Sequence, residues 1–196
     1  MPGLSSPGGP SHQAIEDVAL MRALPNMTVA EPADAVEVAQ SVAAIAGHPG
    51  PVYLRLKRGE NPLIFDDSHR LDLASAQVLQ GGNACDACII ASGMMIPMAL
   101  AAARTLEDSG LSATVINAPV INSLDAATIV AAAQQSRIVV TAENHTVVGG
   151  LRSALPKAWP RPASPSPCAA SASPMSSPSR GAANICSAST GAASRH

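Results

Sequence analysis

The apolar residues in the first sixty positions predict helices and short strands. Four of them lie three and four residues apart, which predicts one buried face of a helix: Ile15, Val18, Ala19 and Ala23. Pro25 and Asn26 predict a turn, because proline does not continue a helix, and a short apolar strand follows at 27–29. His12 therefore precedes a helix, in a loop of the kind where ligands meet open α/β sheets.

A second helix and a second strand complete this first unit. The range 34–47 carries a helical apolar stripe and ends at Gly47, which is typical of a helix C-terminus. The stripe consists of Val36, Ala39, Val42, Ala43, Ile45 and Ala46. β-Branched and aromatic residues at 52–56 then predict a strand. The order strand, helix, strand predicts a parallel βαβ unit.

A second α/β unit is predicted further along the chain. Strands are expected at 87–91, 113–116 and 138–142, and helices at 95–108 and 124–135 between them. In the first of these helices the apolar stripe consists of Met98, Ala101, Ala102 and Leu106. Three strands with two intervening helices predict a small parallel sheet.

The segments between and after the two units differ from them in composition. Turn-forming residues dominate 59–75, which we interpret as a linker between two domains. Residues 153–196 consist mainly of Ala, Ser and Pro and contain no Asp or Glu. Such a composition predicts a disordered, low-complexity tail.

The composition narrows the class of protein. The 196 residues are 47% hydrophobic but only 2% aromatic, so a core must be built from Ala and aliphatic side chains. A net charge of −2 gives no basic surface for nucleic acid or for an anionic membrane. No apolar stretch approaches the roughly 20 residues of a membrane span, and residues 1–10 lack the pattern of a secretory signal. We therefore expect a soluble, cytoplasmic protein.

Cys85 and Cys88 have the spacing of a CxxC motif. A metal site would need a second pair of ligands, and a redox site would need a helix start that lowers a thiol pKa. Cys88 instead leads directly into an apolar strand. Two unreactive thiols are therefore the favoured interpretation, and we expect no metal site in this chain.

Several ordered motifs between about residues 9 and 152 resemble transketolases, which are thiamine-diphosphate enzymes that transfer a two-carbon ketol unit between sugars. The sequence Gly-Pro-Ser-His-Gln at 9–13 and the Leu-Pro-Asn-Met turn at 24–27 are similar to the pyrimidine-binding (Pyr) domain of that family. The similarity continues through 33–37 and 51–56 and then, further along the chain, through 91–95, 115–117, 141–145 and 149–151.

The resemblance implies an α/β fold with a partial Pyr-domain βαβ unit and a small parallel-sheet C-terminal domain. Residues 1–58 would be the C-terminal part of a Pyr domain, 59–75 the linker, 76–152 a truncated transketolase C-terminal domain and 153–196 the tail. The family continues beyond its Gly-Gly-Leu motif, and a shifted reading frame from about Ser153 can encode such a continuation. We therefore also expect a frameshift in the tail, and a similar shift would bring residues 1–7 closer to the family.

The resemblance also implies two substrate-binding residues. His12 matches a histidine that hydrogen-bonds the sugar substrate or the cofactor-bound intermediate, and Arg58 matches an arginine that contacts the substrate phosphate. The donor fork of arginine suits phosphate. The alternatives are a structural histidine at a helix start and a solvated cluster of Arg55, Lys57 and Arg58.

A further family motif at 143–145, Glu-Asn-His, is expected in packing and domain contact. No catalytic residue is expected in this chain, because the glutamate that contacts the pyrimidine ring in the family would lie upstream of it. Thiamine diphosphate and its divalent metal would be bound by an N-terminal transketolase section, the diphosphate-binding half. That section, a second copy of the chain and sugar phosphates are the expected partners, whereas nucleic acid and membranes are not.

The leading hypothesis is therefore a C-terminal subunit or section of a transketolase split over two polypeptides, and we expect this chain to be inactive alone. One alternative is a non-catalytic, truncated remnant of such an enzyme. The other is the β subunit of a related thiamine-diphosphate enzyme, a 2-oxoacid dehydrogenase or 1-deoxyxylulose-5-phosphate synthase.

Overall fold

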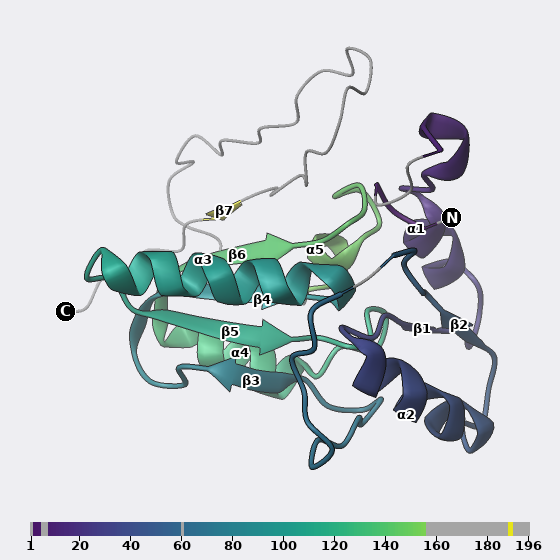
Figure 1. Ribbon diagram of the computed structural model, residues 1–196, viewed down its shortest axis with the longest axis horizontal. Helices are drawn as coiled ribbons and strands as arrows, with labels where there is room; N and C mark the ends of the chain where they lie inside the picture. The colour runs from purple at the N-terminus through teal and green to yellow at the C-terminus, as the bar shows by residue number, and fades with distance from the viewer. Residues whose placement is uncertain (1, 5–7, 60, 156–187, 190–196) are drawn as a thin grey trace.

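The computed structural model describes residues 2–4, 8–59, 61–155 and 188–189, which form two α/β units (Figure 1). The elements of the first unit are η1 (Pro10–His12), α1 (Asp17–Arg22), β1 (Thr28–Ala30), α2 (Ala35–Ala46) and β2 (Val52–Leu54). Strands β1 and β2 pair in parallel, which confirms the predicted βαβ unit.

The second unit is built around a larger sheet. Its elements are β3 (Gln77–Gln80), β4 (Cys85–Ala91), η2 (Gly93–Met95), α3 (Ile96–Asp108), β5 (Ala113–Asn117), α4 (Ala126–Gln134), β6 (Ser136–Ala142), α5 (Leu151–Ala154) and β7 (Ala188–Ser189). The strand order is β3-β5-β4-β6-β7. Strands β5, β4 and β6 are parallel, as predicted, whereas β3 and β7 are antiparallel edge strands that the sequence did not predict.

Helices α3 and α4 cover opposite faces of this sheet (Figure 1). The alternation of side chains along β4 explains how both faces become buried. Ile89 and Ala91 pack in a cluster with α3, whereas Cys88 and Ile90 pack in a second cluster with α4. A strand that is buried on both sides requires a continuous apolar run, which the sequence supplies at 88–91.

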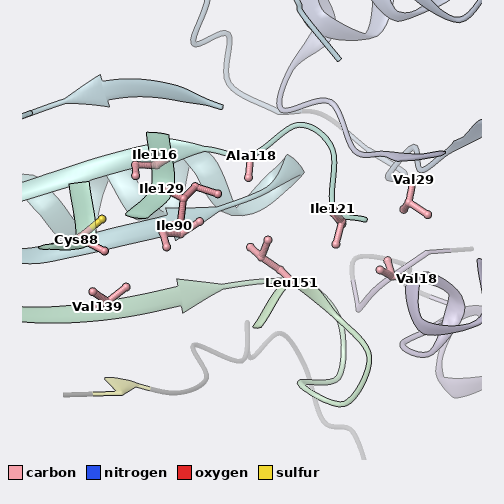
Figure 2. Close-up of a cluster of buried hydrophobic side chains, with 11 residues drawn as sticks. Val18, Val29, Cys88, Ile90, Ile116, Ala118, Ile121, Ile129, Val139 and Leu151 are labelled. Carbon is pink, nitrogen blue, oxygen red and sulfur yellow. The ribbon is translucent and has the colours of Figure 1, made fainter. Parts of the chain in front are cut away.

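The two units share one of these hydrophobic clusters. Val18 of α1 and Val29 of β1 belong to the same cluster as Ile121 and Leu151 of the second unit, and none of the four is more than 1% exposed. Figure 2 shows the side chains of Ile121 and Leu151 lying between the two valines and the larger sheet. The division at 59–75 stays a prediction, but the packing across it is continuous.

Most of the predicted apolar stripe of α2 faces solvent. The buried side chains of α2 are Glu37 and Ser41, whereas Val42 is 68% exposed. The polar side chains are turned inward because the following segment supplies their partners. Asp34, which caps α2, accepts the backbone N–H groups of Ile64 and Phe65, so the predicted linker is bound along the polar side of the helix.

The predicted stripe of α3 has the wrong phase. Ile96, Ala99 and Ala103 are the buried residues, whereas Met98 is 42% exposed. This helix is rich in Ala on every side, so the spacing of apolar residues alone does not select one face.

Most of the predicted tail lies outside the described residues. Within 153–196 the structure describes 153–155, which are the last two residues of α5 and the residue after it, and β7, which pairs with Val139 and Val140 of β6. The expected disorder and frameshift stay predictions. In the parts of the chain that are described, no helix has both the length and the apolar character needed to cross a membrane.

Candidate functional site

A buried arginine joins the two units. Arg55 follows β2 directly and is only 3% exposed. Its guanidinium donates to both carboxylate oxygens of Asp17 at 2.8 and 3.1 Å, to Glu31 Oε1 at 2.5 Å and to the backbone oxygen of Asn144 at 3.0 Å. The planar donor fork of arginine suits this arrangement, which binds α1, the end of β1 and the end of β6 to one side chain.

The charges in this cluster alter one another's ionisation. Burial opposes ionisation of Asp17, but the hydrogen bonds and charge of Arg55 outweigh it and lower the pKa of the carboxyl below its usual value. Tyr53 also donates to Asp17 at 2.8 Å. Burial, together with this carboxylate, raises the pKa of Tyr53 to about 12. The ion pair of Asp17 and Arg55 is therefore fully charged around neutral pH.

Glu31 extends the cluster onto the second sheet. Its Oε2 accepts the hydroxyl of Ser92 at 2.7 Å, while its Oε1 accepts Arg55. Gly93 has φ +51°, and a Cβ at this position would lie 2.4 Å from Cγ of Glu31. Only glycine therefore combines this backbone conformation with the close approach of the glutamate.

Glu37 also contacts the larger sheet, at the end of the neighbouring strand β5. It is fully buried and accepts the backbone N–H of Ala33 at 2.8 Å and the side-chain amide of Asn117 at 2.9 Å. His69 of the linker lies 3.1 Å from the same carboxylate and stacks on Phe65. Burial raises the pKa of Glu37 even though these partners oppose the shift.

These contacts occupy the carboxyl edge of the larger sheet. Ser92, Asn117 and Asn144 follow or end the parallel strands β4, β5 and β6, where open α/β sheets usually bind ligands. Here Glu31, Glu37 and Arg55 of the first unit fill that edge. The edge of the second sheet is therefore an interface between the units, which agrees with the contact role expected for the motif at 143–145.

Glu143 links the end of β6 to the start of α5. It is 4% exposed and accepts the backbone N–H groups of Leu151 at 2.6 Å and Arg152 at 3.1 Å. Burial raises its pKa to about 7, despite these two hydrogen bonds, and the nearby charge of Glu31 adds to the rise. Glu143 is therefore a buried acid whose charge changes near neutral pH.

The two predicted substrate-binding residues lie close in sequence to the buried Asp17–Arg55 pair. His12 ends the exposed turn η1, five residues before Asp17, and its Nδ1 is 2.9 Å from the hydroxyl of Ser11. Arg58 is exposed, three residues after Arg55. The ion pair of Asp17 and Arg55 thus anchors both segments, while the substrate-binding roles themselves stay predictions.

The sequence pattern does not identify Arg55 as buried, because a cluster of charges after a strand predicts a solvated surface. The signal was nevertheless present in the sequence. Glu31 and Arg55 each come one residue after strands that pair in parallel, with Ala30 opposite Leu54. Opposite charges at equivalent positions after two neighbouring parallel strands are therefore adjacent in space.

The described residues do not provide a complete cofactor site. They contain no group of three or more His, Cys, Asp or Glu residues arranged to hold a metal ion. Cys88 is buried, and this burial raises the pKa of its thiol to about 12, so it is a poor metal ligand or nucleophile.

Two family profiles match the chain. The profile described as the transketolase pyrimidine binding domain matches residues 5–62, and the one described as the transketolase C-terminal domain matches residues 75–191. An uncharacterized transketolase family protein of Sinorhizobium fredii, y4mN, is 50% identical over 157 residues, which are 79% of this chain and 45% of that protein.

Two further relatives carry more specific descriptions. The 6-deoxy-6-sulfo-D-fructose transketolase subunit SqwH of a Clostridium species is 38% identical over 78% of this chain and 47% of that subunit. A solved structure described as a split-gene transketolase, inactive beta4 tetramer, is 44% identical, with a TM-score of 0.70 over 74% of this chain and 47% of that one. The chain spans less than half the length of each of these relatives.

The fold and its interface define a two-unit α/β protein in which a βαβ unit packs against the carboxyl edge of a second sheet. With the C-terminal profile matching more than half of its residues, the chain belongs to the transketolase family and carries both Pyr-type and C-terminal-type regions.

Proposed function

We propose that this chain is a C-terminal section of a thiamine-diphosphate-dependent transketolase that is split over two polypeptides. In this role it transfers a two-carbon ketol unit between sugar phosphates together with an N-terminal, diphosphate-binding section. The similarity over both units to the split-gene transketolase chain is the observation that supports this most strongly. We also propose assembly with a second copy of the chain and a cytoplasmic location.

The proposed roles of this chain concern the substrate rather than the chemistry of the cofactor. Thiamine diphosphate supplies the carbanion chemistry when it is bound, and the protein orients the reactants around it. His12 would hydrogen-bond the sugar and Arg58 would bind its phosphate, where the guanidinium donors suit phosphate oxygens. Both residues are exposed on segments anchored by the buried Asp17–Arg55 pair, so they are accessible to a ligand and fixed at one end.

Reconstitution tests this function. The full chain is mixed with a diphosphate-binding transketolase section, thiamine diphosphate and Mg²⁺, and ketol transfer between sugar phosphates is measured. We expect no transfer by the chain alone and transfer by the mixture. Arg58→Ala should raise KM for sugar phosphates at least tenfold, whereas Arg137→Ala, an exposed surface arginine paired with Asp86, should have little effect.

The same experiment tests the split arrangement against the non-catalytic remnant. Ketol transfer by the chain alone would contradict the split arrangement. A folded chain that stays inactive with every diphosphate-binding section tested would favour the non-catalytic remnant. Equal KM values for the Arg58→Ala and Arg137→Ala variants would remove Arg58 from the phosphate site.

A further inference from the structure

The loop between β6 and α5, residues 143–150, lies against the chain that follows His12 (Figure 1). Thr146 N–H in this loop donates to the backbone oxygen of Ile15 at 2.9 Å. This contact joins the second unit to the first at a point that is close in sequence to the proposed substrate-binding side chain of His12.

The far end of the same loop fits closely against α1. Gly149 has φ +79°, and a Cβ at this position would lie 2.4 Å from Cβ of Ala19. Arg22 donates to the backbone oxygens of Gly149 and Gly150, in the second case at 3.0 Å. Glycine at position 149 is therefore favoured both by its backbone conformation and by the close approach to α1.

His145 adds a contact in which both ring nitrogens have defined roles. Its side chain is 2% exposed, and its Nδ1 lies 2.7 Å from the backbone oxygen of Thr146. Because a carbonyl oxygen accepts and does not donate, Nδ1 carries the ring proton. The other nitrogen, Nε2, accepts the backbone N–H of Ala19 at 3.4 Å. The two contacts define one tautomer, protonated at Nδ1 and unprotonated at Nε2.

The N–H of Ala19 needs an acceptor from outside α1. Ala19 is the third residue of this helix, and the first N–H groups of an α-helix have no acceptor within it. The acceptor is a side chain 126 residues away, in the second unit. Asp17, in the same helical turn, is held by Arg55. His145 and Arg55 thus fix two points of the turn that follows the His12 segment.

We propose that the 143–150 loop positions His12 for its substrate and that His145 is the positioning residue, which acts through the first turn of α1. Both of its ring nitrogens are engaged by backbone groups, so the imidazole is placed to hold the chain rather than to contact a reactant. The inference rests on the proposed substrate role of His12 and assigns a function to a residue of the second unit.

NMR of the full chain alone tests the geometry. Above neutral pH the ring of His145 should carry its proton on Nδ1, a measurement that needs no substitution. His145→Leu should speed the amide exchange of Ala19 and Thr146 at least tenfold and shift the ring signals of His12. His145→Gln should restore slow exchange, because its amide oxygen can replace Nε2 as acceptor.

The matched control is His48→Leu. His48 lies 2.9 Å from the hydroxyl of Thr28, so its ring makes a hydrogen bond within the first unit. This variant should leave the exchange of Ala19 and Thr146 and the ring signals of His12 unchanged. A shift of the same size in both leucine variants would mean that any lost histidine contact disturbs His12, and it would refute the specific role of His145.

Kinetics of the enzyme reconstituted with a diphosphate-binding section test the consequence. His145→Leu should raise KM for the sugar phosphate about fivefold with little change in kcat, because a displaced His12 binds substrate less well. His145→Gln should restore KM. The double variant His12→Ala with His145→Leu should have the KM of His12→Ala alone, whereas effects that multiply would show that His145 does not act through His12.

The two kinds of measurement separate the inference from the proposed function. If the reconstituted natural chain transfers no ketol unit, the proposed function fails. In that case, His12 ring signals that shift in His145→Leu still support the positioning contact, and unchanged signals refute it. A proton on Nε2 of His145 in the natural chain, or unchanged exchange of Ala19 and Thr146 in His145→Leu, would overturn the inference whatever the activity.

Discussion

Glu143 makes the stability of the protein depend on pH in a direction that can be measured. Its pKa is about 7 in the folded protein, against an ordinary value of 4.5. The folded state therefore holds this proton more tightly than the unfolded state. Glu143 contributes stability that is complete below about pH 4.5 and is lost as the pH rises through about 7.

The size of the effect follows from the difference in pKa. A difference of about 2.5 pH units corresponds to about 3 kcal/mol, at roughly 1.4 kcal/mol per unit. Burial justifies using most of this value, because the side chain is 4% exposed. Glu143→Gln removes the ionisation but keeps one oxygen that accepts Leu151 N–H. The loss of the Arg152 hydrogen bond costs about 1 kcal/mol.

We therefore expect Glu143→Gln to be more stable than the natural chain by about 2 kcal/mol at pH 8 and less stable by about 1 kcal/mol at pH 4.5. Urea unfolding followed by circular dichroism at several pH values measures this difference. Taking the difference between the two proteins cancels the titration of Asp17 and Glu37. Glu107→Gln, at an exposed position on α3, is the control. A difference that stays constant from pH 4.5 to 8 would refute the reasoning.

Two further predictions concern the buried charge cluster. Arg55→Met should destabilise the chain by about 3–5 kcal/mol, because it leaves the carboxylates of Asp17 and Glu31 buried without the guanidinium. The double variant Arg55→Met with Asp17→Asn should recover part of that loss in urea unfolding. Strictly additive losses would contradict the pairing. Gly93→Ala should lower the free energy of unfolding by about 2–4 kcal/mol, because of its positive φ and because the new Cβ displaces Glu31. Gly110→Ala, also at positive φ but with open space around its Cβ position, should lose only the part due to φ. Equal losses would show that the contact with Glu31 is unimportant.

The sequence predicted most of the backbone fold because strand and helix periods are local properties. The parallel strands β1, β2, β4, β5 and β6 and the three longest helices were all expected. The buried faces of α2 and α3 were not, because both helices are rich in Ala and expose similar apolar surfaces in several directions. Which face turns inward depends on partners far away in the sequence, such as the linker amides that bind Asp34.

The same limit applies to the candidate site. Motifs predict roles for His12 and Arg58, since each lies within a short recognisable segment, and these roles stay predictions. Arg55 was missed because its importance depends on Asp17, Glu31 and Asn144, which are 38, 24 and 89 residues away. Charge at the end of a strand is usually solvated, and only the pairing of β1 with β2 identifies this one as buried.

The contacts between the two units explain how the second unit fixes part of the first. The carboxyl edge of the larger sheet would be a ligand crevice in an isolated α/β domain, yet Glu31, Glu37 and Arg55 of the first unit occupy it. Buried ion pairs of this kind contribute little net stability compared with an apolar interface, but their donors and acceptors stay paired only while the partners keep their relative positions. The second unit therefore fixes the ends of β1 and β2, and with them the segments that carry His12 and Arg58. A substitution in this interface is therefore expected to alter the position of both segments.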